Sequence, residues 1–473
     1  MLKSPTIVFI SFLFSILFSI YLALIASMVI FHDSIGYEYA GKLIFERGFK
    51  QFMIAGPQRE PLYPILVAFS MKLGAMWHLS YQDVLKFLQI SILLLTQILT
   101  WRICKQLKFS HLTTAAVILY IGFSPKIINS ALICYSEIAT YPWLLAIVLS
   151  ASHCWMSLIK EQRNRLLIWS IILGLSFAGA TLTKGVFLLI YPLFVLPIIF
   201  FTFISFKEKN KNLVILSLLF LVSVSVSYNT PIYAYKLANK KLNGQFTISD
   251  SRSSWALFGS TAKRVEPKTN HHLMAAVVYS VGSELCNKYY SLEECFYWTS
   301  SRSDSLGMNK TIELQNQKLS EENVNRQLIQ LSVKEVSKDP IQYFLLTGIE
   351  LIKVLFWDFR DIAYVAAFPT DIENIYNYQP LKYTLYFVMA FLTLVSFIYL
   401  TNFLRKNFSL ITQRSCDMKF IILWQSCLLI LFYDLAYSPF FIDPRHILPL
   451  GPVYLLVIAW MIENLFAQKT SNL

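Results

Sequence analysis

Long apolar runs dominate the chain, and short basic connectors separate many of them. The first run carries no charged residue from Ser4 to Phe31. A helix that crosses the hydrocarbon core of a bilayer needs about 20 apolar residues. The pattern therefore predicts ten membrane spans, at residues 7–31, 84–103, 112–133, 138–158, 166–182, 186–206, 213–231, 383–404, 420–437 and 447–466.

Basic residues gather in alternate connectors. The connectors 102–108, 160–165 and 207–211 hold three Lys or Arg each and 405–419 holds four, whereas 134–137 holds none. Because Lys and Arg collect in cytoplasmic loops, we expect both termini on the cytoplasmic side. Two long segments then face outward, 32–77 and 231–378, and the second is polar for most of its length.

Three parts follow from this pattern. Residues 1–230 form a transmembrane core that includes the first outward loop, 231–378 form a mainly helical outward segment, and 379–473 form the C-terminal transmembrane helices. Within the outward segment, "KLSEENVNRQLIQLSVKEVSK" has apolar residues at helical spacing. The following "IQYFLLTGIELIKVLFW" is apolar but interrupted by Glu350 and Lys353, so we expect an interfacial or re-entrant helix there.

Composition supports an all-α polytopic membrane protein. The 473 residues are 56% hydrophobic and 15% charged, and the mean hydropathy is +0.52. Soluble chains are about 45–50% apolar and about 25% charged. The net charge of +13 fits basic cytoplasmic loops, and we expect no nucleic-acid partner. The first apolar run is longer than a signal-peptide core and lacks a cleavage-site pattern, so we expect it to be retained as an anchor.

Two of the seven cysteines fall together in the outward segment, in "CNKYYSLEEC". Exported compartments permit disulfides. Cys286 and Cys295 therefore form either a disulfide or two free thiols, and a single sequence leaves both open.

Charged residues also gather at the outward ends of the spans and in the first outward loop. An ionisable group at a membrane span is a functional candidate, and this set suits a charged head group carried on a lipid. Its members are Asp33, Glu38, Arg59, Glu60, Lys126, Glu137, Lys184, Arg445 and His446.

Each candidate has a simpler explanation beside it. Lys184 and Arg445 either bind a phosphate or anchor helix ends at the interface. Arg59 and Glu60 could be a surface ion pair, and Glu137 could stabilise the dipole of the helix that it opens. Asp33 or Ser34 could cap the next helix, which would place Tyr37 one turn further along the same face.

Several catalytic motifs are absent from the sequence. It has no D-x-D string for a nucleotide-sugar metal, no phosphate-binding G-x-x-x-x-G-K-[ST], no H-E-x-x-H and no G-x-S-x-G. ATP-driven transport and serine or zinc hydrolysis therefore lack support. We expect no cofactor and identify no metal-ligating residues; a divalent metal stays open, but nothing in the sequence supports one.

Five sequence motifs follow one another along the chain: "HDSIGYEYAGKLIFERG…QREPLYPILVAF", "YSEIATYPWLLA", "GLSFAGATLTKGVFLLIYPLFVL", "VSKDPIQYFLLTGIELIKVLFW" and "DPRHILPLGPVYL". Over nearly the full chain, this series resembles the GT-C membrane glycosyltransferases, in the group of protein O-mannosyltransferases and aminoarabinose transferases. The resemblance implies a GT-C-like fold and a bacterial inner-membrane enzyme whose active site faces the periplasm.

The resemblance also implies a chemistry and roles. The donor would be a polyprenyl-phosphate sugar, and the acceptor a hydroxyl of an envelope glycan such as lipopolysaccharide or of another lipid-linked molecule. Asp33 matches the catalytic base of the first outward loop, Lys184 and Arg445 match donor-phosphate contacts, and Glu137 matches the acid that opens the fourth span. His446, which follows Arg445, is a further candidate for the donor phosphate. From their place on the outward side, and not from the resemblance, we expect these residues to bind substrate: Tyr37, Glu38, Arg59, Glu60, Lys126 and Glu137. The family's common pair of adjacent acids is not kept, because Ser34 follows Asp33.

A polyprenyl phosphate is already a good leaving group. One carboxylate base and a few fixed cations are enough for the transfer, and direct displacement would invert the anomeric centre. Two rivals remain open: a polysaccharide polymerase or ligase that uses a lipid pyrophosphate, and a lipid flippase or transporter without catalysis. Repeated halves with broken helices, which would favour a transporter, are not visible.

Overall fold

The computed structural model describes residues 4–56, 58–249, 252–266, 268–358, 370–408, 416–442 and 444–471. Within these ranges the protein is all-α: its regular elements are helices, and no β-strand is present. The chain divides into two compact units. The first comprises Met1–Ser249, Ala363–Phe432 and Leu448–Leu473, and the second Asp250–Ile362 and Tyr433–Ile447.

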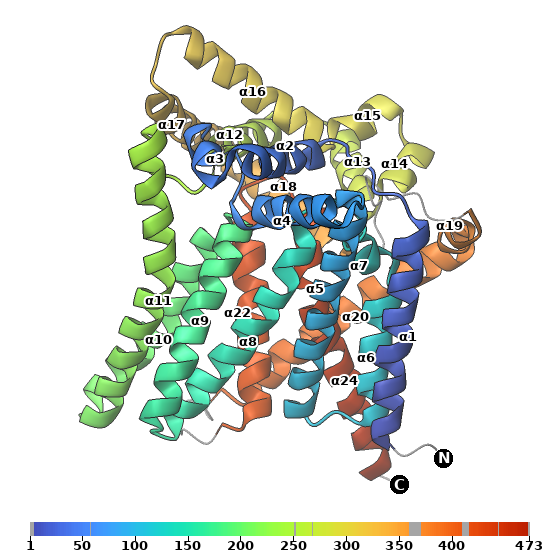
Figure 1. The fold of residues 1–473 in the computed structure, drawn as a ribbon, viewed down its shortest axis with the longest axis vertical. Coiled ribbons are helices and arrows are strands. Elements are labelled where there is room, and N and C mark those ends of the chain that lie inside the picture. The colour runs from blue at the N-terminus through green and yellow to red at the C-terminus, as the bar shows by residue number, and fades with distance from the viewer. Residues whose placement is uncertain are drawn as a thin grey trace. The chain divides into compact units, whose positions relative to one another are not determined.

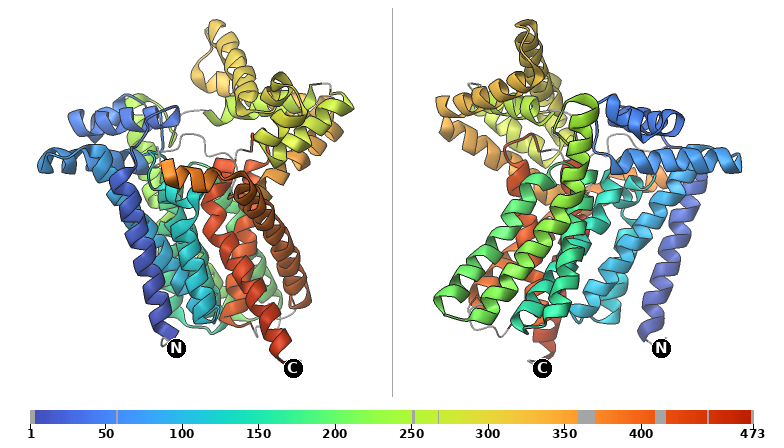
Figure 2. Two further views of the ribbon diagram at one scale, coloured as in Figure 1. Left: turned by 90° about the vertical axis from the view of Figure 1, so that its right-hand side faces the viewer. Right: turned by 60° about the vertical axis from the view of Figure 1, so that its left-hand side comes forward.

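Long apolar helices form the body of the first unit (Figures 1 and 2). They are α1 (Ser4–Ile25), α5 (Tyr81–Gln106), α8 (Glu137–Ile159), α9 (Arg163–Thr183), α10 (Phe187–Lys207), α11 (Lys211–Asn243), α20 (Gln379–Lys406), α22 (Met418–Tyr437) and α24 (Gly451–Ser471). Within the described ranges, nine helices are long and apolar enough to cross a membrane. The protein is a polytopic membrane protein, as the composition predicted.

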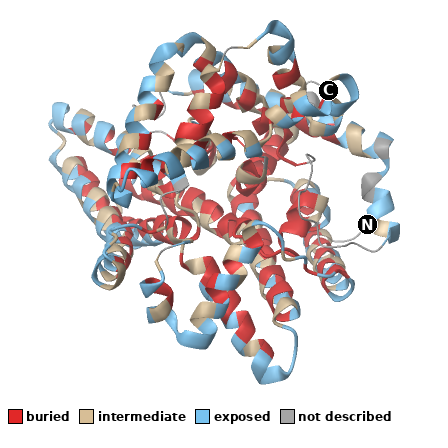
Figure 3. Ribbon diagram, turned by 90° about the horizontal axis from the view of Figure 1, so that it is seen from above, coloured by how far each residue is buried: buried red, intermediate tan, exposed pale blue. Residues whose placement is uncertain are grey.

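Helix α10 illustrates how these helices bury one side and expose the other. Its buried residues include Phe187, Ile190 and Phe194, which recur at helical spacing. Other large apolar side chains of the same helix are exposed, among them Phe200 at 63% and Phe206 at 69%. Figure 3 shows the same division of buried and exposed residues along several long helices. Exposed apolar sides on this scale are what lipid, and not water, accommodates.

One predicted span is wrong in its length. Residues 112–133 were expected to form one helix, but the structure has α6 (His111–Phe123) and α7 (Pro125–Ser130). Pro125 has no N–H to continue the ladder, and Ser124 Oγ accepts from Ile127 N to start α7. The 13 residues of α6 cover about 20 Å, which is shorter than the ~30 Å hydrocarbon core.

Three further boundaries differ from the prediction. The first helix ends at Ile25 and not near residue 31. Helix α11 continues through Pro231 to Asn243, so the predicted domain boundary at residues 230 and 231 falls inside a helix. Residues 433–447 also belong to the second unit, although the sequence placed them with the C-terminal transmembrane helices.

Three shorter helices lie across one end of the helices of the first unit (Figures 1 and 2): α2 (Asp33–Arg47), α3 (Phe49–Ile54) and α4 (Leu62–Trp77). The start of α1 and the end of α24 lie at the opposite end, as do the basic connectors after α5, α8 and α10. The predicted outward loop 32–77 and these three basic connectors therefore occupy opposite ends of this unit. Residues 409–415 of the fourth basic connector lie outside the described residues.

The second unit is built from short helices. They are α12 (Arg252–Val265), α13 (Asn270–Val281), α14 (Ser283–Tyr289), α15 (Leu292–Tyr297), α16 (Ser300–Asn316), α17 (Glu321–Lys338), α18 (Pro340–Leu351), the 3₁₀ turn η1 (Ile352–Phe356) and α23 (Pro444–Ile447). The helix expected around residues 319–336 is confirmed as α17, whose Val324 and Leu328 enter a core with Phe258 and Leu314. With 12 residues, α18 is too short to span a bilayer.

Candidate functional site

Asp33 opens α2 directly after a sharp turn of the backbone. His32 has φ 49°, in the left-handed region that few residues other than glycine adopt. Ser34 Oγ donates to Phe31 O at 2.7 Å and accepts from Phe31 N at 2.5 Å. The N-cap residue makes no side-chain cap hydrogen bond. Ser34 thus stabilises the turn, while the Asp33 side chain stays 32% exposed.

Arg59 holds the Asp33 carboxylate. Its Nη2 lies 2.7 Å from Asp33 Oδ1, and the Arg59 side chain is only 12% exposed. The guanidinium carbon lies 4.7 Å from the ring centroid of Tyr37. A Cβ on Gly36 would come within 3.0 Å of Arg59 Nε, so the glycine leaves room for the guanidinium. Arg59 therefore pairs with Asp33 and does not form a surface ion pair with its neighbour Glu60.

Tyr37 connects this pair to the start of α8. Its hydroxyl lies 2.9 Å from Ser136 Oγ, and its ring meets Tyr63 edge-on at 4.9 Å. Burial, opposed by the charge of Arg59, holds the pKa of Tyr37 above its usual value. Tyr37 is therefore a neutral phenol that can donate one hydrogen bond.

Glu60 bonds a different part of the chain. Its Oε1 accepts from Gly185 N at 2.9 Å and from Ser249 Oγ at 3.3 Å. A Cβ on Gly185 would lie 2.9 Å from the same oxygen, which is too close. Only a glycine allows this approach, so Glu60 joins the first outward loop to the turn after α9.

Lys184, next to Gly185, pairs with an acid of the protein. Its Nζ lies 3.2 Å from Glu137 Oε1, and the two side chains are 13% and 7% exposed. A lysine in a short outward turn runs against the positive-inside bias, and in the structure the carboxylate of Glu137 compensates its charge. Glu137 also stands in the first turn of α8, so a favourable interaction with the helix dipole applies as well.

Six predicted site residues of the first unit thus form one chain of neighbours: Asp33, Tyr37, Arg59, Glu60, Glu137 and Lys184. Glu38 is bonded elsewhere, because its carboxylate accepts from the hydroxyl of Tyr81. Lys126 is 3% exposed in α7. Whether Glu38 and Lys126 bind substrate stays a prediction.

Arg445 and His446 belong to the second unit, on α23. The His446 ring stacks on Tyr437 at 5.2 Å, and the Tyr433 hydroxyl donates to His446 O at 2.7 Å. A role of both residues toward the donor phosphate stays a prediction from the sequence.

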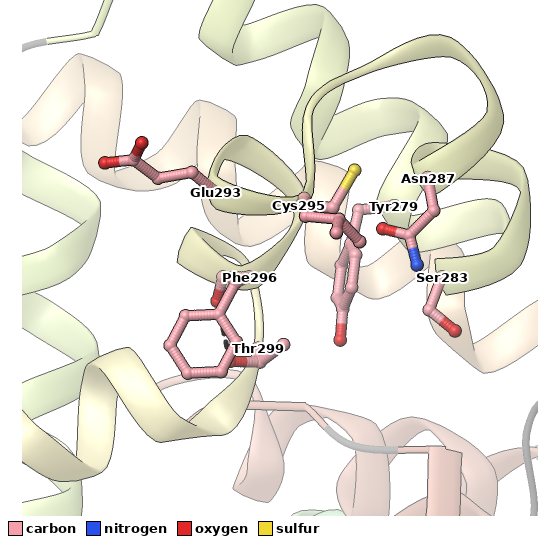
Figure 4. Close-up of a pocket in the computed structure, with 8 residues that line it drawn as sticks. Tyr279, Ser283, Asn287, Glu293, Cys295, Phe296 and Thr299 are labelled. Atoms are coloured by element: carbon pink, nitrogen blue, oxygen red, sulfur yellow. Dashed lines mark hydrogen bonds between the residues drawn. The ribbon is translucent and has the colours of Figure 1, made fainter.

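Cys286 and Cys295 form a disulfide in the structure, with Cα atoms 5.9 Å apart. The bridge joins α14 to α15 beside a pocket of about 400 Å³, shown in Figure 4. The pocket is lined by Tyr279, Ser283, Asn287, Leu292, Glu293, Cys295, Phe296 and Thr299. None of the predicted catalytic or donor-binding residues lines it, so we do not place the reaction there.

Sequence reasoning missed four members of the network: Gly36, Ser136, Gly185 and Ser249. Gly185 follows Lys184 directly and Ser136 precedes Glu137, so adjacency to a candidate was the available signal. Nothing in the sequence marked Ser249. Across the described ranges, no group of three or more His, Cys, Asp or Glu residues could hold a metal ion.

Comparison with known proteins gives little further guidance. No protein-family model matches the chain, and no curated protein matches it. Among solved structures, the archaeal oligosaccharyltransferase AglB from Archaeoglobus fulgidus, in complex with an inhibitory peptide and a dolichol-phosphate, aligns with a TM-score of 0.45 and 12% identity. The match covers 98% of this chain and 50% of that chain, so this chain spans about half the length of AglB. A likeness at this level carries no argument about function.

Proposed function

We propose that this protein is a membrane glycosyltransferase. It moves a monosaccharide from a polyprenyl-phosphate donor to a hydroxyl of an envelope glycan or lipid-linked acceptor, on the outer face of the membrane. Asp33 is the general base, and Lys184, Arg445 and His446 contact the donor phosphate.

The observation that carries the proposal is the Asp33–Arg59 pair and the network behind it. Residues from the starts of α2 and α8, the loop before α4 and the turn after α9 meet at one end of the helices of the first unit. Each of the two ion pairs in this network has one carboxylate. The Asp33 side chain is the more exposed of the two, at 32% against 7% for Glu137. A general base needs this access to an acceptor hydroxyl.

The reaction balances without another reagent. The acceptor oxygen bonds to the anomeric carbon while the bond from that carbon to the phosphate oxygen breaks. The hydroxyl proton moves to Asp33, and the electron pair of the broken bond leaves with the polyprenyl phosphate. A single displacement of this kind inverts the anomeric centre, because no second carboxylate acts as nucleophile.

Arg59 and Lys184 support the two ends of this displacement. The planar guanidinium of Arg59 orients the carboxylate that takes the proton. An ammonium has three N–H donors, so the ion pair of Lys184 with Glu137 is compatible with a contact to phosphate. Positive charge at the leaving phosphate stabilises the transition state.

The direct test is a transfer assay with the purified full chain in lipid nanodiscs. A panel of polyprenyl-monophosphate sugars, a polyprenyl-pyrophosphate oligosaccharide and an acceptor extract would be supplied, with an Asp33→Asn variant as control. Transfer from a monophosphate donor that depends on Asp33 supports the proposal. Use of the pyrophosphate donor alone would identify a polymerase or ligase, and lipid translocation without transfer a flippase.

A further inference from the structure

An irregular segment of the second unit, residues 438–442, directly follows α22 and precedes α23, the helix that bears Arg445 and His446. Phe441 is 9% exposed and Ile442 is completely buried. Backbone carbonyls of a buried irregular segment have no helical partner and need another donor. The donor that the structure provides is a side chain from α12.

Arg264 provides it. The side chain is completely buried, Nη1 donates to Ser438 O at 2.7 Å, and Nη2 donates to Phe440 O at 2.7 Å. Nη2 also lies 2.5 Å from Glu350 Oε2 on α18. One guanidinium thus holds two carbonyls of the segment and one acid of a neighbouring helix.

Two buried lysines contact the same segment through an aromatic ring. Lys263 Nζ lies 4.8 Å and Lys353 Nζ 4.1 Å from the ring centroid of Phe441, and each lysine is 1% exposed. Lys263 also donates to Thr299 O at 3.1 Å. Desolvated cation–π contacts are stronger than exposed ones, so these two contacts restrain the ring of Phe441.

Stability alone does not require this arrangement. Replacing a buried ion pair by apolar side chains of similar volume is often neutral or stabilising. An apolar group, however, cannot bond two carbonyls, and a lysine has no planar fork to do so. What the guanidinium of Arg264 adds is a defined position for residues 438–440, a few residues before Arg445 and His446.

We propose that Arg264 is a positioning residue that sets the place of Arg445 and His446 through the backbone of Ser438 and Phe440. The role rests on the proposed function, in which Arg445 and His446 contact the donor phosphate. Arg264 itself touches neither substrate and acts only through the segment.

The test uses three variants of the full chain in nanodiscs. Arg264→Lys keeps a positive charge beside Glu350 but loses the fork. The double variant Arg264→Gln/Glu350→Gln removes both charges of this ion pair, so neither partner is left as a lone buried charge if the single neutral variant fails to fold. Arg302→Gln is the matched control, because Arg302 forms a more exposed ion pair with Glu266 in the same unit, at 2.9 Å.

The first readout is amide hydrogen exchange without donor. Positioning by Arg264 predicts roughly tenfold faster exchange at 438–447 in both Arg264 variants, with α16 and α17 unchanged. The control should match the wild type. Unchanged exchange at 438–447, or faster exchange throughout the second unit, would overturn the proposal.

The second readout is the transfer assay. Both Arg264 variants should raise the donor KM roughly tenfold to a hundredfold, as expected for a displacement of about 1 Å, and leave kcat within about twofold. Adding Arg445→Ala to either variant should raise KM no further. A full additional effect of Arg445→Ala would contradict positioning. If the wild type transfers no sugar at all, the proposed function fails while the exchange result still decides whether Arg264 holds the segment.

Discussion

Arg59 Nη2 donates to Asp33 Oδ1 across 2.7 Å, although the two residues are 26 positions apart in the sequence. The pair joins the start of α2 to the loop before α4, and Tyr37 packs beneath the guanidinium. A partly exposed carboxylate oriented by a mostly buried cation is suited to accept a proton in a defined direction. The first two predictions test this pair.

Asp33→Asn keeps the size of the side chain but removes its ability to take a proton. Turnover should fall by about 10²–10⁴, the usual contribution of a general base, while folding and donor binding persist. Steady-state kinetics and a separate donor-binding measurement check this. The control is Glu46→Gln on the same helix, whose carboxylate pairs with Lys42 on the surface at 3.7 Å. Near-normal turnover of Asp33→Asn would leave Asp33 a structural residue.

Gly36→Ala should separate activity from stability. Alanine is favoured over glycine inside a helix by about 0.5–1 kcal/mol, so the helix itself is not weakened. The added Cβ would lie 3.0 Å from Arg59 Nε and displace the guanidinium from Asp33. We expect turnover to fall about tenfold or more without a lower thermal unfolding temperature.

Gly348→Ala is the control for that substitution, because a Cβ there meets nothing within 4 Å. It should leave turnover near the wild type and raise stability by up to about 1 kcal/mol, since Gly348 lies inside α18. Equal turnover of Gly36→Ala and the wild type would show that the contact of Arg59 with Asp33 is not needed for the reaction.

Lys184→Ala should weaken donor binding. Loss of a charge-assisted contact to phosphate costs about 1.5–3 kcal/mol, which corresponds to a donor requirement roughly ten- to a hundred-fold higher. Lys42→Ala is the matched control, since Lys42 forms an exposed ion pair with a glutamate and its side chain is 62% exposed. A change in acceptor affinity without a change in donor affinity would refute this role.

The Cys286–Cys295 disulfide should block both thiols in intact, non-reduced cells. A membrane-impermeant maleimide should label neither residue before reduction and both after it. Replacing both cysteines by serine should destabilise the α14–α15 region by about 2–3 kcal/mol, because the bridge closes a short loop in the unfolded chain. Ready labelling without reduction would contradict the bridge.

Glu350 gives the second unit a defined response to acid. Burial alone would raise the pKa of Glu350, but Arg264, Lys353 and Lys263 lower it from its usual value near 4.5 to about 2. A lowered folded-state pKa contributes stability that is complete above about pH 4.5 and is lost as the pH falls toward 2. Limited proteolysis of the second unit against pH should show this loss. The Arg264→Gln/Glu350→Gln variant should lack that dependence, and an identical acid profile would contradict it.

The pattern of apolar residues was sufficient to predict most of the first unit. Runs such as 138–158 and 186–206 appear as α8 and α10 within a few residues, because a bilayer-spanning segment must satisfy its backbone hydrogen bonds within one long helix. The amphipathic spacing around Val324 and Leu328 likewise predicted α17. These features depend on residues close together in the chain, so they can be predicted directly from the sequence.

Partners distant in the chain were decided only by the tertiary structure. Arg59 stands beside Glu60 in the sequence, yet it pairs with Asp33, while Glu60 bonds Gly185. The sequence named Lys184 and Glu137 as separate candidates, and folding made them an ion pair. The helix break at Ser124 and Pro125 could have been predicted from these two residues. The prediction instead followed the hydropathy, which is continuous across them. Hydropathy measures the solvent that a helix prefers, whereas an ion pair depends on which ends of different helices meet, and that is a property of packing.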